Sequence, residues 1–222
     1  MTHLPFDQQL LNACAALMLL LAFVMLSQRR IVSLVNLYAV QGAVLAAATF
    51  LLAWRTGDRQ LYFSAALTLA LKMALLPWLL HRLIRRLQVY WDTEPLLNIS
   101  GTMLAGIVVV VFAFGLAQPI SQLATTSMRN AIGIAVATIL LAFLMMITRR
   151  KAMSQVMGFL SMENGLFFGA MSATYGMPMI IELGIALDVL VAVFVLGIFF
   201  FQIREQFDSL DLHNLERLSE RQ

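Results

Sequence analysis

Long apolar runs, separated by short polar stretches, dominate the pattern of the chain. A helix needs about 20 predominantly apolar residues to cross the hydrocarbon core of a bilayer. On that measure the pattern predicts seven membrane-spanning helices, at residues 8–27, 31–54, 61–80, 97–118, 128–148, 152–173 and 178–202. We therefore expect an all-α fold and a polytopic membrane protein.

The stretch from His81 to Trp91 departs from this pattern. Its apolar residues recur at helical spacing opposite its arginines, and the aromatic pair Tyr90 and Trp91 ends it. Basic and aromatic side chains in this arrangement favour the boundary between membrane and water. We expect an interfacial helix here, between the third and fourth spans.

Composition supports the membrane assignment and narrows the chemistry. Hydrophobic residues make up 61% of the 222 residues and charged residues 12%, as in integral membrane proteins. The one cysteine, Cys14, excludes an internal disulfide, and three scattered histidines form no cluster with metal-ligand spacing, so we expect no cofactor in this chain. Residues 1–9 carry no Lys or Arg and no small-residue cleavage site follows the first run, which predicts a retained helix rather than a signal peptide.

The basic residues separate by side when the seven spans alternate in direction. Eleven fall on one side of the membrane: Arg29, Arg30, Arg82, Arg85, Arg86, Arg149, Arg150, Lys151, Arg204, Arg217 and Arg221. Three fall on the other side (Arg55, Arg59 and Arg129), while Lys72 lies in the middle of the third span. Because cytoplasmic loops carry an excess of Lys and Arg, the N-terminus is expected outside and the C-terminus in the cytoplasm.

Short internal similarities predict a parallel duplication of a three-helix unit. The paired segments are 27–30 with 147–150, 37–42 with 159–165, and 70–72 with 186–188. Spans one to three and spans five to seven are offset by four crossings, so the two units have the same orientation.

We divide the chain accordingly. The N-terminal unit with its interfacial helix occupies 1–96, a linking transmembrane helix 97–127, the C-terminal unit 128–203 and a polar tail 204–222. Leucines at 210, 212, 215 and 218 recur among the charges of the tail. Two interpretations of the tail stay open, namely docking on a cytoplasmic partner and disorder.

Polar side chains inside the spans are the candidates for function. Lys72, Glu163 and Asp188 lie near mid-membrane, Glu182 lies nearer the outer end of the last span, and Gln41 and Asn164 are neutral amides. An ionisable group at this depth costs at least about 2.5–3.5 kcal/mol, so it normally faces protein or water. A buried acid or amine that gains and loses a proton near neutral pH can serve in a proton relay. We therefore predict a proton path through Glu163, Asp188, Lys72, Glu182 and Gln41.

Structural explanations of these residues stay open beside the functional one. Lys72 can be the salt-bridge partner that holds two helices together, and Glu182 can be an interfacial cap. Pro77 can kink the third span or mark its end. Gly165 and Gly169, four residues apart, predict a surface where a neighbouring helix or water approaches closely.

Three segments carry a family resemblance: Met157–Gly165 (MGFLSMENG), Ile181–Asp188 (IELGIALD) and Asp208–Leu215 (DSLDLHNL). They resemble component E of hydrogenase-4 and related membrane-bound formate hydrogenlyase complexes. The C-terminal half is in turn similar to the three-helix K subunit of respiratory complex I and to the C subunit of multisubunit cation/proton antiporters.

The resemblance implies a non-catalytic subunit in the membrane arm of a nickel–iron hydrogenase complex of the bacterial inner membrane. Its implied partners are antiporter-like and quinone-site-like membrane subunits, lipid, and a cytoplasmic hydrogenase arm reached through the tail; no nucleic acid is implied. In K-type subunits membrane glutamates belong to the proton path. Glu163 matches the first by motif, and Asp188 stands where the second is a glutamate. The N-terminal unit has Gln41 and Lys72 in place of the carboxylates.

Three hypotheses follow. The chain conducts or couples protons, with Glu163 and Asp188 as carriers and Lys72 as a tuning or relay group. Alternatively, it is a scaffold whose buried charges are structural pairs, or it belongs to a cation/proton antiporter without redox partners.

Overall fold

The computed structural model describes residues 6–87, 98–122 and 126–174, together with Gly184 and Gly197. The chain divides into two compact units, 1–185 and 186–222, and the helices below all belong to the first. They are α1 (Phe6–Ser27), α2 (Ile31–Thr56), α3 (Arg59–Thr68), η1 (Leu69–Leu75), α4 (Leu76–Leu87), α5 (Ile99–Gln122), α6 (Thr126–Thr148) and α7 (Ala152–Thr174). The described residues are all-helical or in short connections, with no strand among them.

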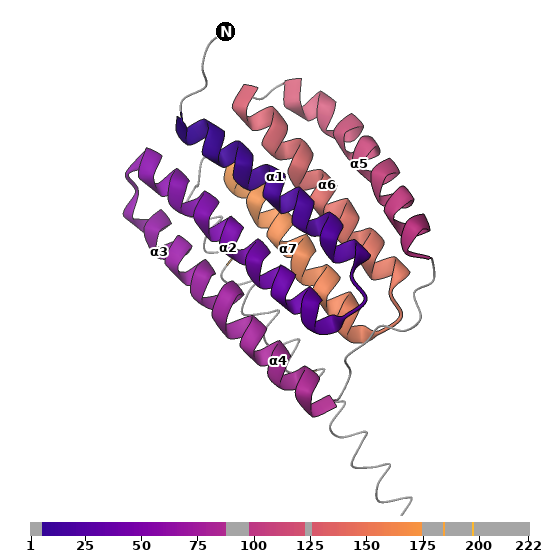
Figure 1. Cartoon of the computed structure of the whole chain (residues 1–222). Coiled ribbons are helices and arrows are strands. Elements are labelled where there is room, and N and C mark those ends of the chain that lie inside the picture. Colours follow the sequence, from indigo (N-terminus) through magenta and orange to yellow (C-terminus); the bar gives the residue numbers. More distant parts are fainter. Residues whose placement is uncertain (1–5, 88–97, 123–125, 175–183, 185–196, 198–222) are drawn as a thin grey trace, which may run out of the picture. The chain divides into compact units, whose positions relative to one another are not determined.

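Two helical hairpins form the centre of this unit. α1 and α2 are joined by residues 28–30, and α6 and α7 by residues 149–151, so both hairpins turn within three residues. α7 packs along α6 and also contacts α2, while α1 lies between α2 and α6 (Figure 1). α5 covers the far side of α6.

α3, η1 and α4 together form one continuous helical rod that packs along α2. The reversal before the rod takes two residues. Gly57 adopts φ +69° and donates its N–H to the Ala53 carbonyl, ending α2 with the left-handed residue that glycine tolerates. Asp58 then caps α3, because its carboxylate accepts a hydrogen bond from the Gln60 N–H at 2.9 Å.

Six of the seven predicted spans lie among the described helices. Within the described residues five stretches are long and apolar enough to cross a membrane: α1, α2, the rod over Arg59–Arg85, α5 over Ile99–Pro119, and α6 over Ala131–Thr148. α7 has 23 residues but contains Ser161, Glu163 and Asn164, and it is not among these five. The segment 178–202 lies outside the described residues except for two positions, so the count of seven and the duplication stay predictions.

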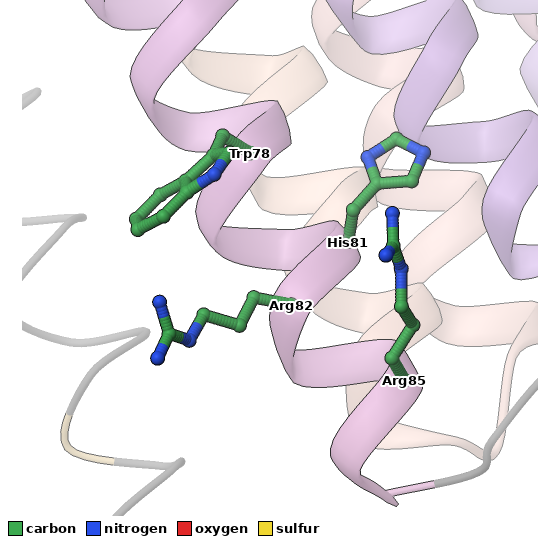
Figure 2. A pocket seen from close by; sticks show the side chains of 4 residues that line it. All are labelled: Trp78, His81, Arg82 and Arg85. Carbon is green, nitrogen blue, oxygen red and sulfur yellow. The ribbon is translucent and has the colours of Figure 1, made fainter.

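The expected interfacial stretch is helical as far as the structure describes it. Residues 81–87 continue the rod without a break, rather than starting a separate helix, and the remainder of the stretch lies outside the described residues. Leu80, Leu83 and Ile84 are buried, whereas Arg82 and Arg85 are exposed, so the predicted amphipathic pattern is present in α4 (Figure 2).

Most of the described basic residues gather at one end of the unit. The Arg149 guanidinium donates to the carbonyl oxygens of Leu26 and Gln28, at 2.9 and 2.5 Å, which brings the two hairpin turns together. At the opposite end Arg55 pairs with Asp7 at 2.7 Å. The separation of charge by end matches the sequence pattern; which end faces the cytoplasm stays a prediction.

Candidate buried ion-pair site

Lys72 lies in η1, a π-helical segment in the middle of the rod. The Leu76 N–H donates to the Leu71 carbonyl, five residues back, which is the widened turn that defines a π-helix. Pro77 follows directly and has no N–H, and in a regular helix its ring would clash with the carbonyl four residues earlier. The wider turn accommodates this proline within a continuous rod, and it sets the direction in which Lys72 leaves the helix.

Gly42 allows α2 to approach Lys72 closely. A Cβ atom at position 42 would lie 2.7 Å from the Lys72 Cβ and 3.4 Å from its backbone carbon and oxygen. Atoms that close to a helix backbone cannot move aside as a flexible side-chain tip could. The glycine therefore fixes the separation of the two helices at the level of the lysine.

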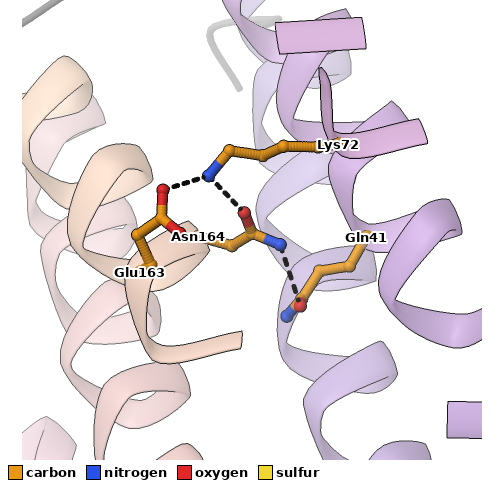
Figure 3. A network of polar contacts seen from close by, with 4 residues as sticks. All are labelled: Gln41, Lys72, Glu163 and Asn164. Atoms are coloured by element: carbon orange, nitrogen blue, oxygen red, sulfur yellow. Dashed lines mark hydrogen bonds and ion pairs between the residues drawn. The ribbon is translucent and has the colours of Figure 1, made fainter. Parts of the chain in front are cut away.

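Lys72 forms a fully buried ion pair with Glu163 of α7 (Figure 3). The ammonium nitrogen lies 2.6 Å from Glu163 Oε1, and both side chains are 1% exposed. The same nitrogen donates to Asn164 Oδ1 at 2.8 Å. The Phe167 ring centroid is 5.9 Å away, so the ring face adds a cation–π contact. Charge-assisted hydrogen bonds of this length are the strong ones in protein interiors, and here they compensate the cost of removing the ammonium from water.

The two amides extend the network with a fixed polarity. An ammonium group only donates, so the oxygen of Asn164 must face Lys72 and its nitrogen must face the other way. That nitrogen donates to Gln41 Oε1 at 3.2 Å, as Figure 3 shows. Gln41 therefore presents its oxygen to Asn164 and directs its own amide hydrogens elsewhere.

Gln41 is completely buried, and Nε2 of its side chain has no hydrogen-bond partner within the part of the chain that the structure describes. A buried amide left without partners costs about 1–3 kcal/mol, so such an atom marks a place where a water molecule or another polar group is favoured. The network can therefore accept a further hydrogen-bond partner at Gln41, which is its neutral end.

Glycines on α7 bring this helix close to α6. A Cβ at Gly169 would lie 2.9 Å from the Ala135 Cβ, and one at Gly165 would lie 3.1–3.3 Å from atoms of Thr138 and Ile139. The close approach predicted for this surface is confirmed, and the neighbour is α6. This packing sets the rotation of α7 that turns Glu163 and Asn164 towards α2 and η1.

The structure brings together three of the five predicted path residues, Gln41, Lys72 and Glu163, and adds Asn164 to them. Asp188 and Glu182 lie outside the described residues, so their positions stay predictions. The π-helical turn and the capping contact of Arg149 were not predicted. The π-helical turn had a signal in the sequence, because Pro77 follows a mid-membrane lysine by five residues. No local pattern indicates the contact of Arg149.

Within the described residues no group of three or more His, Cys, Asp or Glu side chains is placed to hold a metal ion. The expectation of no cofactor in this chain remains a prediction for the chain as a whole.

Comparison with known proteins finds full-length relatives. The chain is 38% identical over 202 residues to Rv0085, an uncharacterized protein of Mycobacterium tuberculosis, covering 90% of this chain and 92% of the relative. It is 26% identical over 210 residues to hydrogenase-4 component E of Escherichia coli K12 and of Shigella flexneri, covering 94% of this chain and 97% of each relative. No family model matches the chain. No solved structure matches it either.

Proposed function

The chain belongs to the same family as the mycobacterial protein Rv0085 and is a more distant relative of hydrogenase-4 component E, and from this kinship we propose that it is a non-catalytic membrane subunit of a hydrogenase complex. Five apolar helices in the described part of the chain and full-length similarity to a hydrogenase component support the assignment. We further propose that it contributes to proton translocation or coupling in a complex of the hydrogenase-4 or formate hydrogenlyase type.

The observation that carries this proposal is the Lys72–Glu163 pair. Both groups can hold a transferable proton, and the donor and acceptor atoms are 2.6 Å apart. Moving one proton along that hydrogen bond converts a charged pair into a neutral pair without changing the net charge of the site. The low-dielectric surroundings therefore oppose this step less than they oppose the isolated ionisation of either group.

The amides give the proposed path a direction. The oxygen of Asn164 accepts a hydrogen bond from Lys72, and its nitrogen donates one to the oxygen of Gln41. All hydrogen bonds of this part of the network therefore point from Lys72 towards Gln41. A water molecule at the Gln41 amide would extend the hydrogen-bonded chain beyond the pair. Asp188 is the further carrier that the resemblance to K-type subunits implies, with Glu163 at the first glutamate position of that pattern. Glu182 is proposed as a successive step from its place in the last predicted span.

One observation favours a second function, that of a scaffold. Lys72 and Glu163 are each only 1% exposed and are held by close helix packing at Gly42, as a purely structural ion pair would be. In that case the pair fixes the rod against α7 and no proton crosses it. The two functions predict different outcomes when both charges are removed together.

The test is proton uptake or release by membrane vesicles during hydrogenase turnover, after co-purification has shown equal assembly of the complex. For a proton carrier, Glu163→Gln abolishes proton movement while part of the electron transfer remains. The double variant K72M/E163Q removes both charges and so leaves no buried charge unpaired. For a carrier it assembles but stays uncoupled, whereas for a scaffold it both assembles and couples. Gly115→Ala, at an open position on α5, is the matched control and keeps full coupling.

A further inference from the structure

Among the described residues, four side chains of α4 line a cavity of about 310 Å³ at the basic end of the rod. They are Trp78, His81, Arg82 and Arg85, and they belong to neither the ion pair nor the amides of the candidate site. Figure 2 shows two pairs: Trp78 and Arg82 extend to one side of α4, while Arg85 points up the helix towards the His81 ring.

Helical geometry puts these four side chains on one face. At about 100° per residue, positions 78, 81, 82 and 85 fall within an arc of about 100°. Among the described side chains of α4 the opposite arc is occupied by buried Leu76, Leu80, Leu83 and Ile84, and buried Pro77 lies between the two arcs. The packing of the helix therefore uses one face, and the cationic and aromatic face is turned outward.

The two guanidinium groups carry charge that the described residues do not neutralise. Neither Arg82 nor Arg85 forms an ion pair with a carboxylate in the described part of the chain, and both side chains are exposed. The Arg82 guanidinium lies 5.4 Å from the Trp78 ring centroid, which holds it beside the indole. The cavity thus offers two forked donors to an anion, a geometry that matches phosphate oxygens.

His81 adds one more directed group. Its Nδ1 lies 2.7 Å from the Pro77 carbonyl oxygen. A carbonyl oxygen only accepts, so Nδ1 carries a hydrogen and donates it. Nε2 is then the ring atom left to meet a ligand, and it donates to an anion when it too carries a hydrogen, as in the imidazolium form.

The position of the cavity along the rod indicates what kind of phosphate it meets. In the sequence the apolar stretch of the rod gives way to Arg82, Arg85 and Arg86, and basic residues that follow an apolar span stand at the level of the lipid headgroups. Before them come exposed apolar side chains, Met73 at 50% and Leu75 at 47%, and then Trp78 at 58%. Along the rod, apolar surface is followed by an indole and then by guanidinium groups. A phospholipid has the matching order, with its acyl chain followed by the interfacial region and then by the phosphate.

We propose that Trp78, His81, Arg82 and Arg85 bind the phosphate of an anionic phospholipid whose acyl chain lies along the exposed residues before Trp78. Basic pockets on membrane helices bind such headgroups, and the exposed apolar surface beside this one distinguishes a lipid from free phosphate. This site does not depend on the proposed function, because it shares no residue with the ion-pair site.

The test is native mass spectrometry of the purified full chain in detergent. The chain is titrated with phosphatidylglycerol, with phosphatidylcholine of the same acyl chains, and with inorganic phosphate. We expect wild type to retain phosphatidylglycerol in preference to the other two, and R82Q/R85Q to bind it roughly tenfold more weakly. The matched single variants are Arg85→Gln and Arg59→Gln, since Arg59 is an exposed arginine at the other end of the same rod. Arg59→Gln retains the wild-type preference.

Each contrary result overturns the proposal in its own way. Inorganic phosphate bound as well as the lipid would make free phosphate the ligand. Equal losses in Arg59→Gln and Arg85→Gln would reduce the effect to general surface charge. Absence of a phosphatidylglycerol preference in wild type would exclude the lipid site. Unchanged helical circular dichroism verifies that the variants are folded.

Discussion

α5 and α7 pack on the same neighbour, α6, and have nearly equal lengths, 24 and 23 residues, but they distribute polarity in opposite ways. Only 17% of the most apolar stretch of α5 is buried, and Val111 and Leu104 are 69% and 66% exposed. In α7, 13 residues are buried, and Glu163 and Asn164 are among them. The more apolar helix is the more exposed one.

This contrast shows how burial works when the solvent is a bilayer. In water apolar side chains are driven inward, but lipid tails are as apolar as a protein core and provide no such drive. A polar group, by contrast, finds no partner in hydrocarbon and must face other protein groups or water. In this chain the polar pattern of α7, rather than its apolar content, marks the helix that belongs inside.

The largest effect is expected when α7 is made more apolar. Glu163→Leu raises the hydropathy of α7 but removes the carboxylate that pairs with Lys72, and breaking a buried pair in this way costs about 3–5 kcal/mol of the free energy of unfolding. The measurement is thermal or denaturant unfolding of the chain in detergent.

The double variant K72M/E163L is the control, because it removes the partner charge as well. It recovers most of the lost stability, since two apolar residues can replace a buried ion pair at little cost. A Glu163→Leu protein as stable as wild type would show that α7 needs no polar side chain at this position. The contrast between α5 and α7 would then be contradicted.

A smaller effect is expected when α5 is made polar. Val111 lies midway along α5 and is 69% exposed, so Val111→Lys places a charge against the acyl chains. Membrane insertion of α5 then becomes less favourable by about 2.5–3.5 kcal/mol. The inserted fraction, measured by glycosylation mapping of α5 in microsomes, falls accordingly, while Val111→Leu leaves it unchanged. Full insertion of the lysine variant would indicate that this face of α5 is covered by protein.

The smallest effect on stability is expected when a single methyl group is added to each helix, because only α7 is closely packed at its glycine. A Cβ at Gly158 of α7 would lie 2.6 Å from Met146 Cγ and 3.2 Å from the Ala142 carbonyl oxygen, whereas a Cβ at Gly115 of α5 meets nothing within 4 Å. Gly158→Ala therefore destabilises the chain by about 1–3 kcal/mol through overpacking. Gly115→Ala changes stability by no more than about 1 kcal/mol, as helix propensity allows. Equal unfolding midpoints for the two variants would contradict the close α6–α7 contact.

Much of the fold follows from local pattern. Apolar runs of about 20 residues predicted the helices well, with α2 observed at Ile31–Thr56 for a predicted 31–54 and α7 at Ala152–Thr174 for 152–173. The turns could also be placed, because two basic residues interrupt the runs at 29–30 and three at 149–151. The third span was predicted to end at residue 80, whereas the helical rod continues to Leu87. The amphipathic pattern after His81 resembles that of a separate interfacial helix.

The candidate site was predictable only as a set of separate residues. Position within the apolar runs was enough to place Gln41, Lys72 and Glu163 at similar depth, because each stands near the middle of a run. The contact of Lys72 with Glu163 and Asn164, 91 and 92 residues away along the chain, emerges only from the packing of the helices. Helical periodicity fixes which residues share a face, but the rotation of one helix against another depends on contacts such as those of Gly42 and Gly165, which no pattern within a single helix contains.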